Sequence, residues 1–208
     1  MINKKIFSIT LLVIFGVVFI WSAINPHDFF TWLLEVLPVI IALPILLFTY
    51  QKFSLTPLLY ILILIHAIIL MVGAHYTYAL VPIYELPVFA WVTDAFDLHR
   101  NYYDRIGHFV QGFVPAMIAR EILIRKNIVK SAWLFFMVCC ICLSISACYE
   151  FIEWWVALGS GQAAEAFLGT QGDVWDTQWD MFLALVGAIL AQILLANFHD
   201  RQLQQLET

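Results

Sequence analysis

The sequence predicts an all-α fold, a polytopic bundle of six transmembrane helices with both termini in the cytoplasm. Of its 208 residues, 63% are hydrophobic and only 12% are charged, and the mean hydropathy is +0.89. A water-soluble domain of this size could not bury so much apolar surface, so we expect lipid to surround most of the chain. The chain has no basic stripe with interleaved aromatic residues, which argues against nucleic acid as a partner.

Six apolar runs are long enough to be helices that cross a bilayer, which requires about 20 residues. They cover residues 6–24, 32–50, 55–75, 106–124, 131–156 and 179–198. The first run resembles a secretion signal, but Trp21-Ser22-Ala23 lacks the small-x-small pattern of a cleavage site. Pro38 and Pro44 predict a kink within the second run. We find no internal repeat and no soluble domain, so we expect residues 1–208 to form one membrane domain.

The orientation of the bundle follows from its basic residues, which favour the cytoplasmic side of short connections. Eight of the ten lie at the N-terminus, the second and fourth connections or the C-terminus: Lys4, Lys5, Lys52, Arg120, Arg125, Lys126, Lys130 and Arg201. With six spans these four places share one side, so we expect both termini to be cytoplasmic. Only Arg100 and Arg105 fall on the other side.

The two long connections are then expected outside, at residues 76–105 and 157–178. Residues 81–96 of the first are apolar, interrupted by Pro82 and Pro87, and too few to span. We expect this stretch to be an interfacial or re-entrant segment.

Polar residues gather at the predicted outer ends of three spans. The three sets are Asp104, His108 and Gln111, then Ser146, Glu150 and Glu153, then Asp173, Asp176 and Asp180. Spacings of three and four residues place each set on one face of its helix. The third span adds His66 and His75, which are nine residues apart, so only one of them can point toward the others.

Carboxylates at this density cannot all stay ionised without compensation, which predicts a bound cation or ion pairs. Oxygen ligands suit Mg, Ca or Mn, and an added imidazole admits Zn or Fe. We predict a divalent cation as cofactor, with candidate ligands Asp104, His108, Glu150, Glu153, Asp173, Asp176 and His75. The candidate catalytic residues are His108, Glu150 and Glu153. The candidate substrate-binding residues are Arg100, Arg105 and Gln111.

A structural role for the same residues stays open. The acids before the sixth span could cap its helix, because acids satisfy the free amides and the dipole at a helix N-terminus. Arg100 and Arg105 could form buried ion pairs with the acids of the fourth and fifth spans.

Four segments of the chain resemble a known family. They are residues 73–78, 100–109, 149–155 and 169–180, which read GAHYTY, RNYYDRIGHF, YEFIEWW and GTQGDVWDTQWD. The chain resembles the YjdF-like family of bacterial inner-membrane proteins over most of its length, which implies a multi-pass protein of the bacterial inner membrane and no particular reaction. It is also loosely similar to VanZ-like membrane proteins, which place an acid and a histidine at the head of one span and an acid-rich turn before another.

Three functions fit this pattern. The first is a metal-dependent membrane enzyme acting on a lipid or envelope precursor from the outer side. The second is a small proton- or ion-coupled transporter, which would also need polar residues in the inner half of the spans. The third is a non-catalytic subunit whose outer loops bind a protein partner that the sequence does not identify. In all three the lipid bilayer is the surrounding partner.

Overall fold

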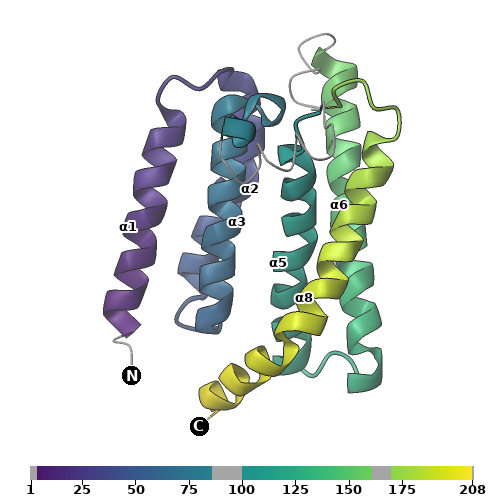
Figure 1. The fold of residues 1–208 in the computed structure, drawn as a ribbon. Helices are drawn as coiled ribbons and strands as arrows, with labels where there is room; N and C mark the ends of the chain where they lie inside the picture. Colours follow the sequence, from purple (N-terminus) through teal and green to yellow (C-terminus); the bar gives the residue numbers. More distant parts are fainter. Residues whose placement is uncertain (1–3, 86–99, 161–169, 208) are drawn as a thin grey trace.

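The computed structural model describes residues 4–85, 100–160 and 170–207 (Figure 1). The described part is helical and contains no strand. Its α-helices are α1 (Lys4–Ala23), α2 (Phe29–Thr49), α3 (Pro57–Tyr76), α5 (Tyr103–Arg125), α6 (Ser131–Ser160) and α8 (Asp176–Glu207), and two short 3₁₀ helices, η1 (Tyr78–Leu80) and η2 (Ile83–Glu85), follow α3. Each predicted apolar run therefore coincides with one α-helix, which confirms the all-helical membrane class.

The helix boundaries reflect local sequence signals. Asp28 caps α2 by accepting a hydrogen bond from the backbone N–H of Thr31 at 2.7 Å, and this bond holds the pKa of the Asp28 carboxyl below its usual value. Pro57 begins α3, at a position where a helix needs no amide donor. Pro38 and Pro44 lie inside α2, which continues through both. The largest difference from the predicted spans is α8, which continues beyond its apolar run to Glu207.

Successive helices run in opposite directions, so both chain termini lie at the same end of the bundle (Figure 1). We call this the terminal end; it also holds the connections at residues 50–56 and 126–130. The distal end holds the connection that follows α1, residues 77–85 after α3 and residues 170–175 before α8. Helix α1 lies at one edge against α3, and α6 and α8 lie at the other edge, with α5 between them and α3 (Figure 1).

Five of the described helices are long and apolar enough to cross a membrane: α1, α2, α3, α6 and α8. Helix α5 matches them in length with 23 residues, but its composition is more polar, with five charged residues. Its position is central, because α3, α6 and α8 pack around it, and its charged residues Asp104, Arg120 and Glu121 are buried.

The tightest helix crossing joins α5 and α8. Gly112 of α5 lies against the backbone of Ala184, and Gly187 of α8 lies against the backbone of Phe109 and Phe113. Small residues let two helix backbones approach closely, which is the usual way that helices associate in lipid. This crossing fixes the polar face of α5 relative to the start of α8.

The connection after α3 folds back onto the distal end. Tyr78, Val81, Ile83 and Tyr103 are buried together in one apolar cluster. Only residues 81–85 of the predicted interfacial stretch at 81–96 lie in the described part, and residues 86–96 lie outside it.

Candidate functional site

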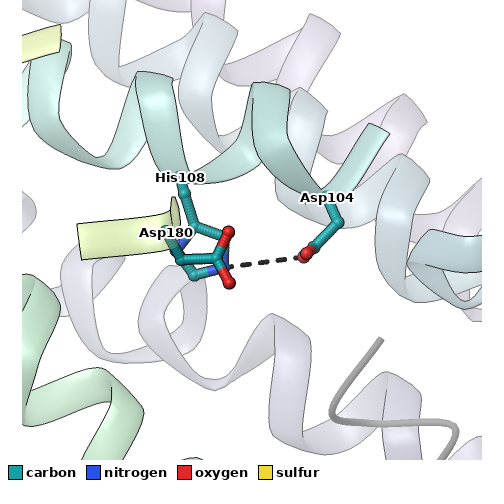
Figure 2. A group of neighbouring side chains, drawn as sticks. All are labelled: Asp104, His108 and Asp180. Atoms are coloured by element: carbon teal, nitrogen blue, oxygen red, sulfur yellow. Dashed lines mark ion pairs between the residues drawn. The ribbon is translucent and has the colours of Figure 1, made fainter. Parts of the chain in front are cut away.

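His108 is the centre of the polar cluster at the distal end. On α5, its Nε2 lies 3.5 Å from Oδ1 of Asp104, and its Nδ1 lies 3.0 Å from Oε1 of Gln111. The side chains of Asp104 and His108 are both buried, and Figure 2 shows them one turn apart on α5. The spacing of one helical turn that the sequence indicated therefore brings these three residues together.

Helix α8 contributes a second carboxylate to the same imidazole nitrogen. Oδ2 of Asp180 lies 3.8 Å from Nε2 of His108, and the Asp180 side chain is only 2% exposed. Figure 2 shows Asp180 beside the His108 ring, with Asp104 one turn away along α5. One ligand atom from each of these three residues lies within 4.8 Å of the others, a separation that allows all three to bind one cation.

Helix α6 places two more carboxylates on the other side of His108. Oε1 of Glu150 lies 4.0 Å from Nδ1 of His108, and Glu153 lies one turn further along the helix. A ligand atom from each of these glutamates and one from His108 also lie within 4.8 Å of one another. The hydroxyl of Ser146 is buried on the same face.

Sequence reasoning missed Glu35, which α2 adds to the edge of this cluster. Glu35 is 5% exposed, and the Tyr149 hydroxyl donates a hydrogen bond to its Oε2 at 3.3 Å. The Tyr149 ring lies edge-on to His108, with 6.3 Å between the ring centroids. The sequence did contain a signal for this residue, because Glu35 is the only charged residue in the second apolar run. A charged residue in a span usually faces a polar partner.

Tyr78 also borders Glu35 and was not predicted. Thr77 ends α3 with a φ of 56°, a conformation that a β-branched residue rarely adopts. This turn directs the Tyr78 ring between α3 and α5, where it lies against Gly73 and Gly107. A larger residue at either glycine would collide with the Tyr78 ring. The position of this ring therefore depends on glycine at both places.

The two arginines form a separate outer layer with the acids before α8. Arg100 pairs with Asp176, lies 3.5 Å from Asp173 and donates to the Thr170 carbonyl at 2.7 Å. Arg105 Nη2 lies 2.5 Å from Asp173. The backbone N–H of Trp175, together with the two guanidiniums, lowers the pKa of Asp173 from its usual value.

The sequence left open whether the acids bind a cation or form ion pairs, and the structure pairs only some of them with arginines. Asp173 and Asp176 form ion pairs with the arginines. Asp104 reaches Arg100 only at 4.0 Å, and its nearer charged neighbour is His108. Asp180, which was not among our candidate ligands, lies beside His108. We had expected Asp173 and Asp176 at this place.

His75 lies away from this cluster. Its Nδ1 is 3.1 Å from the backbone carbonyl of Ser22, and its ring lies 4.5 Å from that of Trp21, both on the α1 side of α3. The structure therefore does not bring His75 together with the other candidate ligands, because it belongs to the contact between α1 and α3.

Several carboxylate oxygens in the cluster are buried without a hydrogen-bond partner. Among the described residues these include Oδ2 of Asp104, Oε1 of Glu150 and Oδ1 of Asp180. An unpaired buried carboxylate is costly, and each of these three residues faces the same imidazole. The cluster thus has an excess of acceptors and negative charge that calls for protons or a cation.

A second buried polar network lies at the terminal end, and the sequence did not predict it. Glu121 of α5 accepts hydrogen bonds from Thr56 Oγ1 at 2.8 Å and Arg125 Nη1 at 2.7 Å, and its Oε2 lies 2.9 Å from Nε2 of His199. Nδ1 of His199 lies 2.9 Å from Nη1 of Arg120. Arginine can only donate, so His199 accepts at Nδ1 and carries its proton on Nε2 toward Glu121.

The two clusters differ in how well their polar atoms are satisfied. In the terminal network both oxygens of Glu121 and both ring nitrogens of His199 have partners. Arg120, which we assigned to a cytoplasmic connection, is a buried residue of α5 that also pairs with Asp200 at 2.8 Å. A fully paired network of this kind is typical of a contact that stabilises the fold. The distal cluster differs, because it contains buried carboxylate oxygens without a hydrogen-bond partner.

The fold and the distal cluster together define a polytopic helical membrane protein with buried carboxylates at one end. The family described as "Predicted membrane protein (DUF2238)" matches residues 7–201. The chain is also 53% identical over 205 residues to "Inner membrane protein YjdF" of Escherichia coli (strain K12), covering 98% of this chain and 93% of that protein. The chain therefore belongs to this family of multi-pass inner-membrane proteins. No solved structure shows significant similarity to it.

Proposed function

We propose that the chain crosses the inner membrane six times with both termini in the cytoplasm, and that the distal cluster is an outward-facing divalent-cation site of an enzyme that acts on a lipid or envelope precursor. The six-span topology is supported by the alternating helix directions and by the basic residues at the terminal end. The two basic residues of the distal end, Arg100 and Arg105, are paired with acids.

The observation that carries the cation site is the convergence of Asp104 and Asp180 on Nε2 of His108. Their oxygens lie 3.5 and 3.8 Å from this nitrogen, and each carboxylate has a buried oxygen without a hydrogen-bond partner. Gln111 Oε1 can accept a hydrogen bond from the Nδ1–H of His108, which would leave the Nε2 lone pair free for a cation between the two carboxylates. Two carboxylates and one imidazole suit Mn²⁺, Fe²⁺ or Zn²⁺.

Glu150 and Glu153 are then free to act in proton transfer. Glu150 lies 4.0 Å from the Nδ1 edge of His108, within the same buried cluster. A bound cation would polarise an ester or phosphate oxygen of the substrate and lower the charge density of the cluster. A neighbouring glutamate could accept a proton from the attacking group, which is the usual role of a second carboxylate beside a metal.

An apolar layer below the cluster favours an enzyme over a transporter. The buried core between the distal cluster and the terminal network includes Leu59, Met117, Val138, Cys142 and Ala188, with apolar neighbours. Gln192 is a buried polar residue in this region, and its amide donates to the Ala188 carbonyl of its own helix and to the Phe135 carbonyl and Cys139 Sγ of α6. A coupled transporter needs polar groups through both halves of the bundle, and this layer interrupts them.

Metal content of the purified protein tests the proposal. The full chain is purified in detergent, and bound metal is measured after exposure to Mn²⁺ or Zn²⁺ and removal of the excess. We expect about one tightly bound ion per chain, since the three ligand atoms form one compact group. His108→Ala and Asp180→Asn should lose this ion, while Glu85→Gln, which changes an exposed carboxylate of the distal end, should keep it.

The outcomes separate the proposal from its alternatives. A wild-type protein that elutes as a folded species and binds no more metal than His108→Ala would contradict the cation site. In that case the carboxylates must be neutralised by protons, and proton-driven transport or a purely structural role would explain the cluster better. Thermal unfolding of each variant shows whether a loss of metal reflects the ligand or a loss of fold.

A further inference from the structure

A groove opens on the lipid-facing seam between α5 and α8, next to the distal cluster. Its volume is about 390 Å³, within the range of small-molecule sites. The residues that line it are Tyr102, Arg105, Ile106, Phe109, Trp179 and Leu183. Arg105 is the only charged residue among them, and the rest are apolar or aromatic.

Arg105 retains hydrogen-bonding capacity in this groove. Its Nη2 bonds to Asp173, but its Nε is buried and has no hydrogen-bond partner. The guanidinium lies over the rings of Trp179, at 5.0 Å, and Tyr102, at 5.5 Å. The Arg105 side chain is 15% exposed. Because a guanidinium offers donors along more than one edge, an anionic oxygen could bind at its exposed edge while Asp173 keeps its bond to Nη2.

The groove is polar at its distal end and apolar further in. From Tyr102 to Phe109 the helix advances roughly 10 Å toward the middle of the bundle, and Leu183 lies one turn below Trp179 on α8. A phosphate at Arg105 would therefore lie at the level of the aromatic residues, and an attached acyl chain would follow Ile106, Phe109 and Leu183.

The groove and the cation site use neighbouring residues of the same two helices. Arg105 follows Asp104 on α5, and Trp179 precedes Asp180 on α8. Adjacent residues on a helix lie on faces about 100° apart, so the groove and the cluster lie on different sides of one helix seam. A headgroup held by Arg105 at the distal end would be next to the buried cluster.

We propose that this groove binds a phospholipid, with Arg105 on the phosphate and the apolar residues on an acyl chain, and that this lipid class is the substrate of the proposed enzyme. The proposal rests on the proposed function for its catalytic part, while lipid binding can be measured without turnover. A comparison groove of about 410 Å³ on α6, lined by Ile141, Ser144, Ile145, Cys148, Tyr149 and Ile152, has no cationic side chain and serves as an internal control.

Native mass spectrometry of the delipidated full chain in detergent provides the test. The probes are dioleoyl phosphatidylglycerol and dioleoylglycerol, which share acyl chains and differ by the phosphate headgroup. We expect wild type to bind the phospholipid at least ten times more tightly than Arg105→Gln, because the variant removes the phosphate partner. Leu183→Trp should weaken binding similarly by filling the groove, while Ile145→Trp in the comparison groove should bind like wild type. Dioleoylglycerol should not distinguish wild type from Arg105→Gln.

Phosphatidylglycerol binding that is equal in wild type, Arg105→Gln and Leu183→Trp would overturn the proposal. Loss in Arg105→Gln with full binding in Leu183→Trp would overturn it too, because the phosphate would then bind outside the groove. Metal content of the same variants separates the two proposals. Lipid binding without metal in the wild type would defeat the cation site alone, and metal without lipid binding would defeat the groove alone.

Discussion

Nδ1 of His108 lies 3.0 Å from Oε1 of Gln111, three residues further along α5. An amide oxygen can only accept a hydrogen bond, so this contact favours the tautomer of His108 that carries its proton on Nδ1. The opposite nitrogen, Nε2, faces Asp104 and Asp180 and would offer its lone pair to a cation bound between them. Gln111, which the sequence suggested as a substrate-binding residue, is better placed to orient this imidazole.

We predict that Gln111→Leu weakens metal binding by about 10- to 100-fold, the usual effect of removing a group that orients a ligand. Competition titration with a chelator of known affinity measures the change. Gln192→Leu is the matched control, since it removes another buried glutamine of the bundle that lies away from the cluster. Equal affinity in wild type and Gln111→Leu would show that Gln111 does not orient the imidazole.

The sequence predicts contacts within one helix better than contacts between helices. Asp104 and His108 are four residues apart on one helix, so their proximity follows from helical geometry alone. Whether Asp173 or Asp180 lies beside His108 depends on where α8 begins, and this helix begins at Asp176. Asp173 lies before that point in a turn, where it pairs with Arg105 instead. Helix boundaries of this kind depend on tertiary contacts that hydropathy does not record.

The terminal network shows a second limit of hydropathy. The apolar run of the last span ends at residue 198, so His199 appeared to lie outside the helix. In the structure α8 continues to Glu207 and places His199, fully buried, against Glu121 and Arg120. Charged residues that satisfy one another can remain in a helix core, and their pairing across the chain is not visible in local composition.

We predict that Gly187→Ala destabilises the bundle and that Gly16→Ala does not. A methyl group at Gly187 would overlap the Phe109 carbonyl and come within 2.9 Å of the Phe113 backbone nitrogen, while Gly16 has nothing within 4 Å. Overpacking at such a contact costs about 1–3 kcal/mol. The half-buried helical Gly16 should tolerate alanine, which raises helix propensity by up to about 1 kcal/mol. Thermal unfolding in detergent measures both, and an unchanged midpoint for Gly187→Ala would contradict the close crossing.

We predict that the terminal network stabilises the fold without affecting the metal. His199→Ala removes one buried hydrogen bond from Arg120 and one from Glu121, and a hydrogen bond to a charged group contributes about 1.5–3 kcal/mol. The midpoint of thermal unfolding should fall, while the metal content of the folded fraction stays at the wild-type value. His27→Ala, at an exposed histidine, controls for loss of an imidazole. Loss of metal in His199→Ala would indicate that the two clusters are coupled through the apolar layer.

Reporter fusions test the six-span topology. Eight of the ten basic residues lie on the side that we assign to the cytoplasm, which sets orientation strongly in short connections. A reporter that is active only outside the cytoplasm should therefore be silent after Thr208 and active when inserted beside Gly172, an exposed residue of the turn before α8. A reporter that is active only in the cytoplasm should give the opposite pattern, which guards against a fusion that fails to fold. Activity of the first reporter after Thr208 would mean an odd number of spans. Helix α5, the least apolar of the six, would then be the first helix to reconsider as a span.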